Sequence, residues 1–364
     1  MTSSQLIEQR LRNQMLTTAA SPKMEEVVAA LGAVQSQDFV GAKWALGARV
    51  AKLTEAEVDR AYDEGRILRT HVLRPTWHFV APADIRWMLA LTAPRVHGFS
   101  SSAYRKFELE TKVFSRCHKA IVRALEGGTH LTRGELKAAL RKAGVESETV
   151  RLGLILMHAE LSALICSGPR RGKHATYALL EERVPATRAL STEEALAELT
   201  RRYVRSHGPV TTRDFAWWSG LSMADARRGF ASIASELEQH VLEDLTYYSS
   251  ASASAKGTAR PRKRSASPTA WLLPNYDEYF IAYKDRDLVL QGTPKTLGVR
   301  PEFAHLLTID GRLTGTWKRT FSPRDAGVDL RTFRPLTKPE RTALNKTIAR
   351  YSAYLQLPTT LSVA

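Results

Sequence analysis

The amino-acid sequence predicts a mainly α fold with small β-hairpins (α+β), built from three tandem winged-helix units. The first observation is an order of helices followed by two short β-type segments, which occurs within residues 4–80 and again within residues 119–180. The second is an internal repeat, because residues 207–215 match residues 128–136 in register at an apolar-Thr-x-x-acid-apolar core. The composition, 43% hydrophobic and 25% charged, is ordinary for a globular chain of two or three domains.

The first unit, residues 1–118, is predicted to begin with helices between residues 4 and 62. Ser21-Pro22 is a cap followed by a first-turn proline, and apolar residues from Val27 to Val34 recur at helical spacing. Thr54, with Glu57 three positions later, is a capping-box signature for a further helix. The remaining elements expected here are β-type segments at 67–71 and 76–80 and a helix at 84–91.

The second unit, residues 119–188, is predicted to contain helices and two paired strands joined by a basic turn. Its expected helices are 119–125, 133–142 and 147–161, and its expected strands are 162–166 and 176–180. The third unit, residues 189–364, is expected to start with a helix at 192–206, followed by the repeated segment and a long recognition helix from Met223 to Glu243. It then carries a low-complexity basic insert at 249–268, a strand-like segment at 269–274 and β-type segments at 306–333 around Asp310-Gly311.

The charge of the chain indicates a polyanionic partner. With 53 Lys and Arg against 37 Asp and Glu, the formal net charge is +16. The two cysteines lack metal-type spacing, which favours a reducing compartment without disulfides. No apolar run reaches the ~18 residues of a membrane span, so we expect a soluble, cytoplasmic protein with no membrane partner.

Several common chemistries have no support in the sequence. Residues 168–173 superficially resemble a phosphate-binding loop, but three residues instead of four separate the glycines, and His174 stands where Ser or Thr would bind magnesium. The histidines show no HExxH spacing, and no GxSxG nucleophile motif occurs. We therefore expect no metal and no cofactor.

Two basic loops are the first candidate binding features. Arg170, Arg171 and Lys173 lie at the turn of the second unit, and Arg262, Lys263 and Arg264 lie in the insert. Such side chains neutralise phosphates and release counterions when a protein binds nucleic acid. Either loop alone is more typical of a solvated charged surface, whereas both together on repeated units of a strongly basic chain favour DNA binding.

A pair of amides and a short aromatic hairpin are the other candidate features. Gln35 and Gln37 share a side only if the backbone between them is extended or irregular, because in a helix they would diverge by ~200°. On residue types alone this pair is more typical of a helix end than of an active site. In residues 69–80 polar and aromatic residues alternate, which is equally typical of a half-buried strand pair in which His78 is hydrogen-bonded.

These motifs, taken together and in order, resemble the AlkZ/YcaQ family of winged-helix DNA glycosylases. The resemblance covers nearly the whole chain and rests on separated segments. They are Gln35-Ser36-Gln37, the His-x-Leu-Arg-Pro-Thr-Trp-His-Phe-Val segment 71–80, the Pro-x-Tyr-Asp-Glu-Tyr segment 274–279, Tyr283-Lys284-Asp285-Arg286, and Gly315-Thr316-Trp317-Lys318-Arg319. It implies that the tandem units form a C-shaped scaffold around double-stranded DNA.

The resemblance also implies an activity and a site. Family members excise bases alkylated at guanine N7, and the AlkZ branch unhooks interstrand crosslinks made by natural-product genotoxins. The family's catalytic motif is Gln, an aliphatic residue and then Gln in the AlkZ branch or Asp in the YcaQ branch. Gln35 and Gln37 match the AlkZ form and would be catalytic, while Ser36 departs from the aliphatic middle position. An amide can accept from water and donate to a sugar or phosphate oxygen, but it takes up no proton at neutral pH. Such a site suits a leaving base that is already cationic.

Further residues receive roles by the same resemblance. Arg74, Trp77 and His78 would contact DNA or line the lesion site, and Lys318 and Arg319 would lie in a hairpin against the DNA. The chain is then a monofunctional DNA glycosylase that acts as a monomer. The alternative is a non-catalytic winged-helix protein such as a transcriptional regulator, and if the amides proved inactive, Asp277 and Glu278 would be the next candidates.

Overall fold

The computed structural model describes residues 1–17, 22–251, 267–294, 298 and 300–363. The N-terminal part is a set of helices around a small sheet whose strand order is β1-β3-β2. Its elements are α1 Ser3–Asn13, α2 Met24–Leu31, β1 Val34–Gln35, α3 Phe39–Gly47, α4 Glu55–Asp63, β2 Leu68–His71, β3 Trp77–Val80 and α5 Ile85–Lys106. The predicted capping box is present, because the Thr54 hydroxyl accepts from the Glu57 amide and the Glu57 carboxylate accepts from Thr54.

The next part closely follows the expected order of helices and a β-ribbon. It comprises α6 Thr111–Leu125, β4 Leu131–Thr132, α7 Arg133–Lys142, α8 Thr149–Leu161, β5 Ile165–Arg171, β6 His174–Leu179 and α9 Leu180–Arg183. Strands β4, β6 and β5 form a three-stranded sheet in that order. The repeat predicted from the sequence has a structural counterpart, because Thr132 caps α7 and Thr211 caps α11 through the same reciprocal bond to an acidic residue three positions later.

The third part corrects one expectation. It comprises α10 Thr192–His207, α11 Thr212–Ser219, α12 Met223–Ser232, η1 Ala234–Glu236, β7 Leu237–Leu242 and β8 Leu245–Ser250. The long helix predicted from Met223 to Glu243 was wrong, since α12 ends at Ser232 and the following residues form the β7–β8 hairpin. Glu243 and Asp244 have φ of 48° and 61°, a left-handed pair that closes the tight turn between the two strands.

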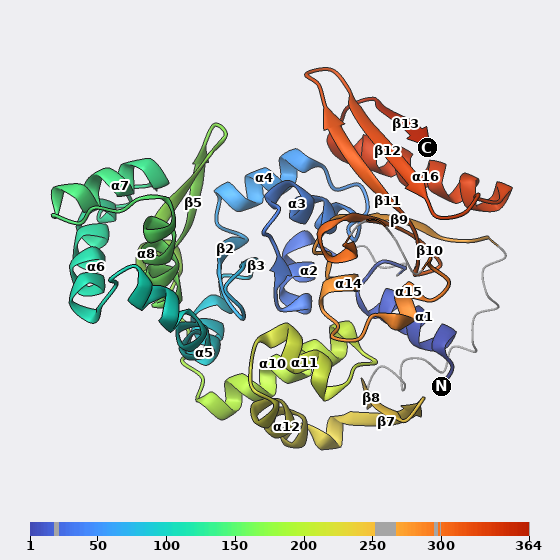
Figure 1. The fold of residues 1–364 in the computed structure, drawn as a ribbon, viewed down its shortest axis with the longest axis horizontal. Coiled ribbons are helices and arrows are strands. Elements are labelled where there is room, and N and C mark those ends of the chain that lie inside the picture. Colours follow the sequence, from blue (N-terminus) through green and yellow to red (C-terminus); the bar gives the residue numbers. More distant parts are fainter. Residues whose placement is uncertain (18–21, 252–266, 295–297, 299, 364) are drawn as a thin grey trace.

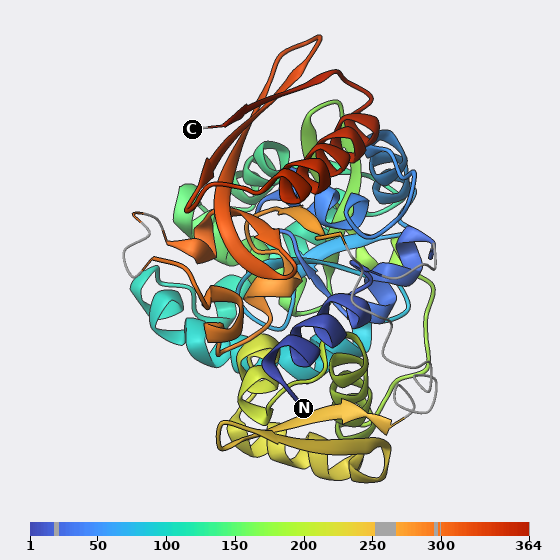
Figure 2. The ribbon, with the colours of Figure 1, turned by 90° about the vertical axis from the view of Figure 1, so that its right-hand side faces the viewer.

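The C-terminal part is a five-stranded sheet and one long helix. Its elements are β9 Ala270–Leu273, α14 Glu278–Ile281, α15 Asp287–Leu290, η2 Pro301–Phe303, β10 His305–Ile309, β11 Arg312–Phe321, β12 Ala326–Thr332, α16 Lys338–Leu355 and β13 Thr359–Val363. The strand order is β13-β12-β11-β10-β9, antiparallel except for the parallel β12–β13 pair. In Figures 1 and 2 the β5–β6 and β11–β12 hairpins project from the same side of the molecule.

The two ends of the chain share one hydrophobic core. Buried residues between Ile7 and Phe79 pack with buried residues between Ala270 and Leu355. Two buried indoles tie this core to β9, since Trp44 donates to the Leu272 carbonyl at 2.6 Å and Trp317 donates to the Leu273 carbonyl at 2.9 Å. A second core lies mainly in residues 68–233. The division at residues 118 and 188 stays a prediction, and the structure adds that the last segment packs against the first.

Candidate active site

The Gln35-Ser36-Gln37 segment has the extended backbone that the sequence analysis required for two amides on one side. Helix α2 ends at Leu31, and Gly32 follows with a φ of 79°, a conformation that favours glycine. Strand β1 then pairs with β3, with Gln35 opposite His78. The Ser36 amide continues the pairing by donating to the Trp77 carbonyl at 2.7 Å.

The Gln35 side chain is buried and oriented by a cation. Its residue is only 6% exposed, and its Oε1 accepts a hydrogen bond from Arg74 Nη2 at 2.7 Å. Because a guanidinium can only donate, this contact fixes the carbonyl end of the amide toward Arg74. The Gln35 amide nitrogen is therefore the end that can donate to a ligand.

Gln37 offers a second amide that is much less constrained. Its side chain is exposed, and its Oε1 lies 3.4 Å from the Trp77 backbone nitrogen, a long hydrogen bond. The structure thus brings one fixed amide and one accessible amide to the same short segment, two residues apart. Their chemistry fits positioning of water or sugar oxygens, because neither group titrates near neutral pH.

Ser36, the residue that departs from the family motif, has a clear packing partner. It is fully buried, and Arg69 Nη2 donates to its carbonyl oxygen at 2.9 Å while Arg69 Nε reaches its hydroxyl at 3.3 Å. The Arg69 guanidinium also lies over the Trp77 ring, 4.5 Å from the centroid. Ser36 is thus a satisfied polar residue, and sequence reasoning gave no role to Arg69, which holds the turn.

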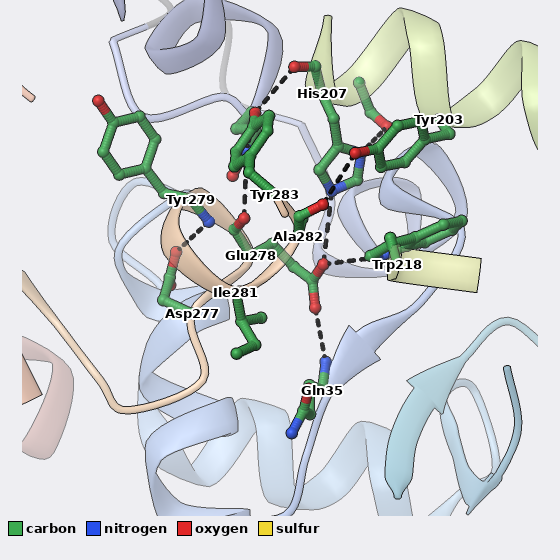
Figure 3. Close-up of polar contacts among 12 residues, drawn as sticks. Gln35, Tyr203, His207, Trp218, Asp277, Glu278, Tyr279, Ile281, Ala282 and Tyr283 are labelled. Atoms are coloured by element: carbon green, nitrogen blue, oxygen red, sulfur yellow. Dashed lines mark hydrogen bonds and ion pairs between the residues drawn. The ribbon is translucent and has the colours of Figure 1, made fainter. Parts of the chain in front are cut away.

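Glu278 holds the same turn from the other side (Figure 3). Its carboxylate is buried, with Oε1 accepting from the backbone N–H of Gln35 and Oε2 accepting from Trp218 Nε1, each at 2.9 Å. His207 Nε2 lies 3.4 Å from the same Oε2. Burial lowers the pKa of His207 although the nearby carboxylate opposes the shift. Both oxygens of Glu278 are therefore engaged with protein groups around Gln35.

Asp277, the neighbouring acid, has a structural partner. Its carboxylate forms a bidentate ion pair with buried Arg49, with both N–O distances at 2.8 Å. The remaining Arg49 donors reach the backbone and side chain of Gln14 and the Ala45 carbonyl. Burial opposes the charge of Arg49, but Asp277 beside it keeps the pKa raised above its ordinary value.

His78 lies beside Gln35 in the sheet as a neutral imidazole. It is fully buried, and its Nδ1 lies 3.0 Å from the Thr76 carbonyl, which requires that nitrogen to donate. Burial, followed by the charge of Arg74, lowers the pKa of His78 well below its usual value. Its Nε2 has no hydrogen-bond partner within the part of the chain that the structure describes. His78 therefore supplies a lone pair at this site and no acidic proton.

The predicted DNA-binding residues of the β5–β6 turn differ in their surroundings. Arg170 pairs with Asp59 at 2.9 Å and with Asp63 at 2.8 Å, and these contacts raise its pKa. Arg171 pairs with Glu135 and lowers the pKa of that carboxyl to about 2. Lys173 is exposed and, among the described residues, has no ion-pair partner. Arg262, Lys263 and Arg264 lie outside the described residues.

The two predicted DNA-binding residues of the β11–β12 hairpin also differ in their surroundings. Lys318 is exposed on β11. Arg319 Nη2 donates to both carboxylate oxygens of Asp38, at 2.9 Å and 2.6 Å, and Asp38 caps helix α3 directly after Gln37. Arg319 thus ties the C-terminal sheet to the end of the Gln35–Gln37 segment, a contact that sequence spacing could not reveal.

Among the described residues no group of three or more His, Cys, Asp or Glu side chains is arranged to hold a metal ion. In the same part of the chain no helix is both long enough and apolar enough to cross a bilayer.

The comparisons with known proteins agree with this fold. Residues 28–354 match the family described as "DNA glycosylase AlkZ-like", so the chain belongs to that family and is an enzyme that hydrolyses N-glycosidic bonds. It is similar to the "Interstrand DNA cross-link repair glycosylase" of Streptomyces sahachiroi, with 24% identity over 333 residues that cover 86% of this chain and 87% of that protein. The solved structure of Streptomyces sahachiroi DNA glycosylase AlkZ aligns with a TM-score of 0.80 at 21% identity, covering 99% of both chains. This likeness confirms the predicted fold class.

Proposed function

We propose that this DNA glycosylase removes N7-alkylated purines from double-stranded DNA and leaves an intact abasic site. The observation that carries the proposal is that the groups around Gln35 offer no proton to a leaving base. Both oxygens of Glu278 accept hydrogen bonds from protein groups, and His78 is neutral. A neutral base needs protonation to leave, whereas a purine alkylated at N7 already carries positive charge.

The two amides then have separate roles. The N–H donors of Gln35 hold a sugar, phosphate or water oxygen, because its carbonyl is held by Arg74. Gln37 is exposed, and its carbonyl oxygen can accept a hydrogen bond from a water molecule. Together they place water against an oxocarbenium-like sugar, and positioning of this kind accounts for much of the rate enhancement in hydrolysis of glycosidic bonds.

The proposed partner is the duplex, bound by a monomer. Lys173 and Lys318 are exposed cations on the β5–β6 and β11–β12 elements, which project from the same side of the molecule (Figure 1). We assign them, with Arg262, Lys263 and Arg264 of the insert, to the DNA backbone. The named activity of the Streptomyces sahachiroi relative makes interstrand crosslinks and bulky adducts candidate substrates as well.

Base release tests the proposal directly. A duplex containing N7-methylguanine is incubated with excess enzyme, and free base and strand scission are measured separately. We expect release of N7-methylguanine with the strand intact until alkaline treatment, and a second arm with a crosslinked duplex tests unhooking. Binding to the duplex without base release would instead support the transcriptional-regulator alternative, and strand scission without alkali would contradict the monofunctional mechanism.

A further inference from the structure

Three cationic side chains surround one indole ring beside the candidate active site. The ring belongs to Trp217 on α11, and its N–H donates to the Ile281 carbonyl at 2.9 Å. Measured to the ring centroid, Arg74 Cζ lies at 5.9 Å, Lys284 Nζ at 4.6 Å and Arg286 Cζ at 5.4 Å. These distances are within the range of cation–π contacts, so the indole holds the three cations near one another.

These cations lack carboxylate partners. Among the described residues, neither Arg74, Lys284 nor Arg286 has a carboxylate oxygen within the 4.0 Å of an ion pair. Arg286 donates through Nε to the Phe280 carbonyl at 3.1 Å, but its Nη2 is buried and has no hydrogen-bond partner in the described part of the chain. A buried, unpaired guanidinium nitrogen is costly, and it is a donor that an incoming anion could satisfy.

The cations also repel one another. Burial is the main factor that lowers the pKa of Arg74, and the charge of Arg286 lowers it further while Glu278 opposes the shift. Burial likewise lowers the pKa of Arg286, against a weaker opposing effect of Glu302 and Asp214. The carboxylates of Glu278, Glu302 and Asp214 offset part of this charge from a distance, and like charges that form no ion pair among the described residues favour binding of an anion.

The position of the cluster identifies the anion. Arg74 uses the same guanidinium to contact the Gln35 carbonyl at 2.7 Å, so the cluster lies next to the proposed catalytic amide. We propose that Arg74, Lys284 and Arg286, gathered around Trp217, bind a phosphodiester of the damaged strand beside the lesion. This inference rests on the proposed function. Binding of that phosphate places the lesion sugar against Gln35 and relieves the repulsion among the three cations.

The Trp217 ring makes this site more selective than a flexible basic loop. Long Lys and Arg side chains lose rotational freedom when they bind, and the indole restricts them in advance. Lys284 is exposed and can be changed without disturbing packing, whereas Arg286 is partly buried. Lys284→Gln is therefore the main variant, and Arg286→Lys, which keeps the charge, is the conservative companion.

The test measures binding to a duplex with a tetrahydrofuran abasic-site analogue, in which single phosphates next to the analogue are replaced by neutral methylphosphonates. We expect one such replacement to weaken binding by the wild-type protein and to weaken binding by Lys284→Gln by a clearly smaller factor, because Arg74 and Arg286 still contact the phosphate in the variant. The slope of log K against log salt should fall by about one for Lys284→Gln and stay unchanged for Arg286→Lys. Lys346→Gln, the same substitution at an exposed lysine of α16, controls for net charge and should keep the methylphosphonate effect.

Two results would overturn the inference. One is a methylphosphonate effect of equal size in wild type and Lys284→Gln at every position. The other is that millimolar inorganic phosphate competes with the duplex for the protein while no methylphosphonate replacement changes binding, which would identify a site for free phosphate. Binding to the abasic analogue needs no base release. If the glycosylase assay fails while the methylphosphonate effect still depends on Lys284, the proposed function alone is contradicted.

Discussion

Replacement of Gln37 by alanine is the sharpest test of the amide mechanism, because the structure separates its chemistry from its packing. The side chain is exposed, and its one described hydrogen bond is the 3.4 Å contact from the Trp77 amide. Removal of so weak an exposed contact should change the free energy of unfolding by less than about 0.5 kcal/mol. Loss of a positioned contact to water in the transition state should slow base excision roughly tenfold to a thousandfold, or about 1.4–4 kcal/mol.

The assay is single-turnover release of N7-methylguanine with enzyme in excess, so that slow product release does not obscure the chemical step. Urea unfolding and affinity for an abasic-analogue duplex are measured on the same preparations, and both should match wild type. Gln37→Asp is the matched variant, since it recreates the other motif of the family and offers a carboxylate that can take a proton from water; it should retain substantial activity. Excision by Gln37→Ala at the wild-type rate would refute the water-positioning role.

Gln35→Ala should slow base release by a similar factor but should also lower the free energy of unfolding by about 1–3 kcal/mol, because partly buried Arg74 loses its acceptor. Urea unfolding measured beside Gln37→Ala shows whether this loss of stability is present. Asp277→Asn should cost about 3–5 kcal/mol of stability by leaving the Arg49 charge unpaired, and a loss below about 1 kcal/mol would contradict this account. Burial and neighbouring histidines lower the pKa of His158 to about 3, so as the pH falls below 6.5 the unfolded chain takes up a proton that the folded chain does not. Stability should therefore fall as the pH drops from 6.5 toward 4.5. Thermal unfolding at each pH should show a flatter dependence for His158→Gln. Base release should be unchanged in excess EDTA, since amides carry the proposed chemistry, and loss of activity that one metal restores would count against the site.

Features set by local chemistry could be predicted from the sequence. The capping box at Thr54 needs only a hydroxyl and an acid three residues apart, and it forms as expected. The deciding contact lies within a few residues of the motif, so the pattern itself carries the information.

Features set by distant contacts could not be predicted in the same way. The strand β7 replaces the end of the expected long helix because it pairs with β8, an interaction that helical spacing does not report. The sequence predicts that Arg170, in the basic turn of residues 168–173, contacts DNA. In the structure it forms ion pairs with Asp59 and Asp63 of α4, and these depend on how the β5–β6 turn packs against that helix. The link between Glu278 and Gln35 joins segments that no motif connects.

The contact between Gln35 and Glu278 spans 243 residues, and this separation has a consequence in time. At the usual synthesis rate of roughly 5–20 residues per second, the carboxylate of Glu278 is made about 12–50 s after the backbone N–H of Gln35 in the proposed catalytic turn. During that interval the apolar faces of α2 and α3 remain uncovered, because the C-terminal strands and helix α16 that pack on them have not yet been made. A ribosome-bound or truncated chain that ends near residue 250 therefore has its glutamines but no finished site, and excision begins only when the last part of the protein has been made.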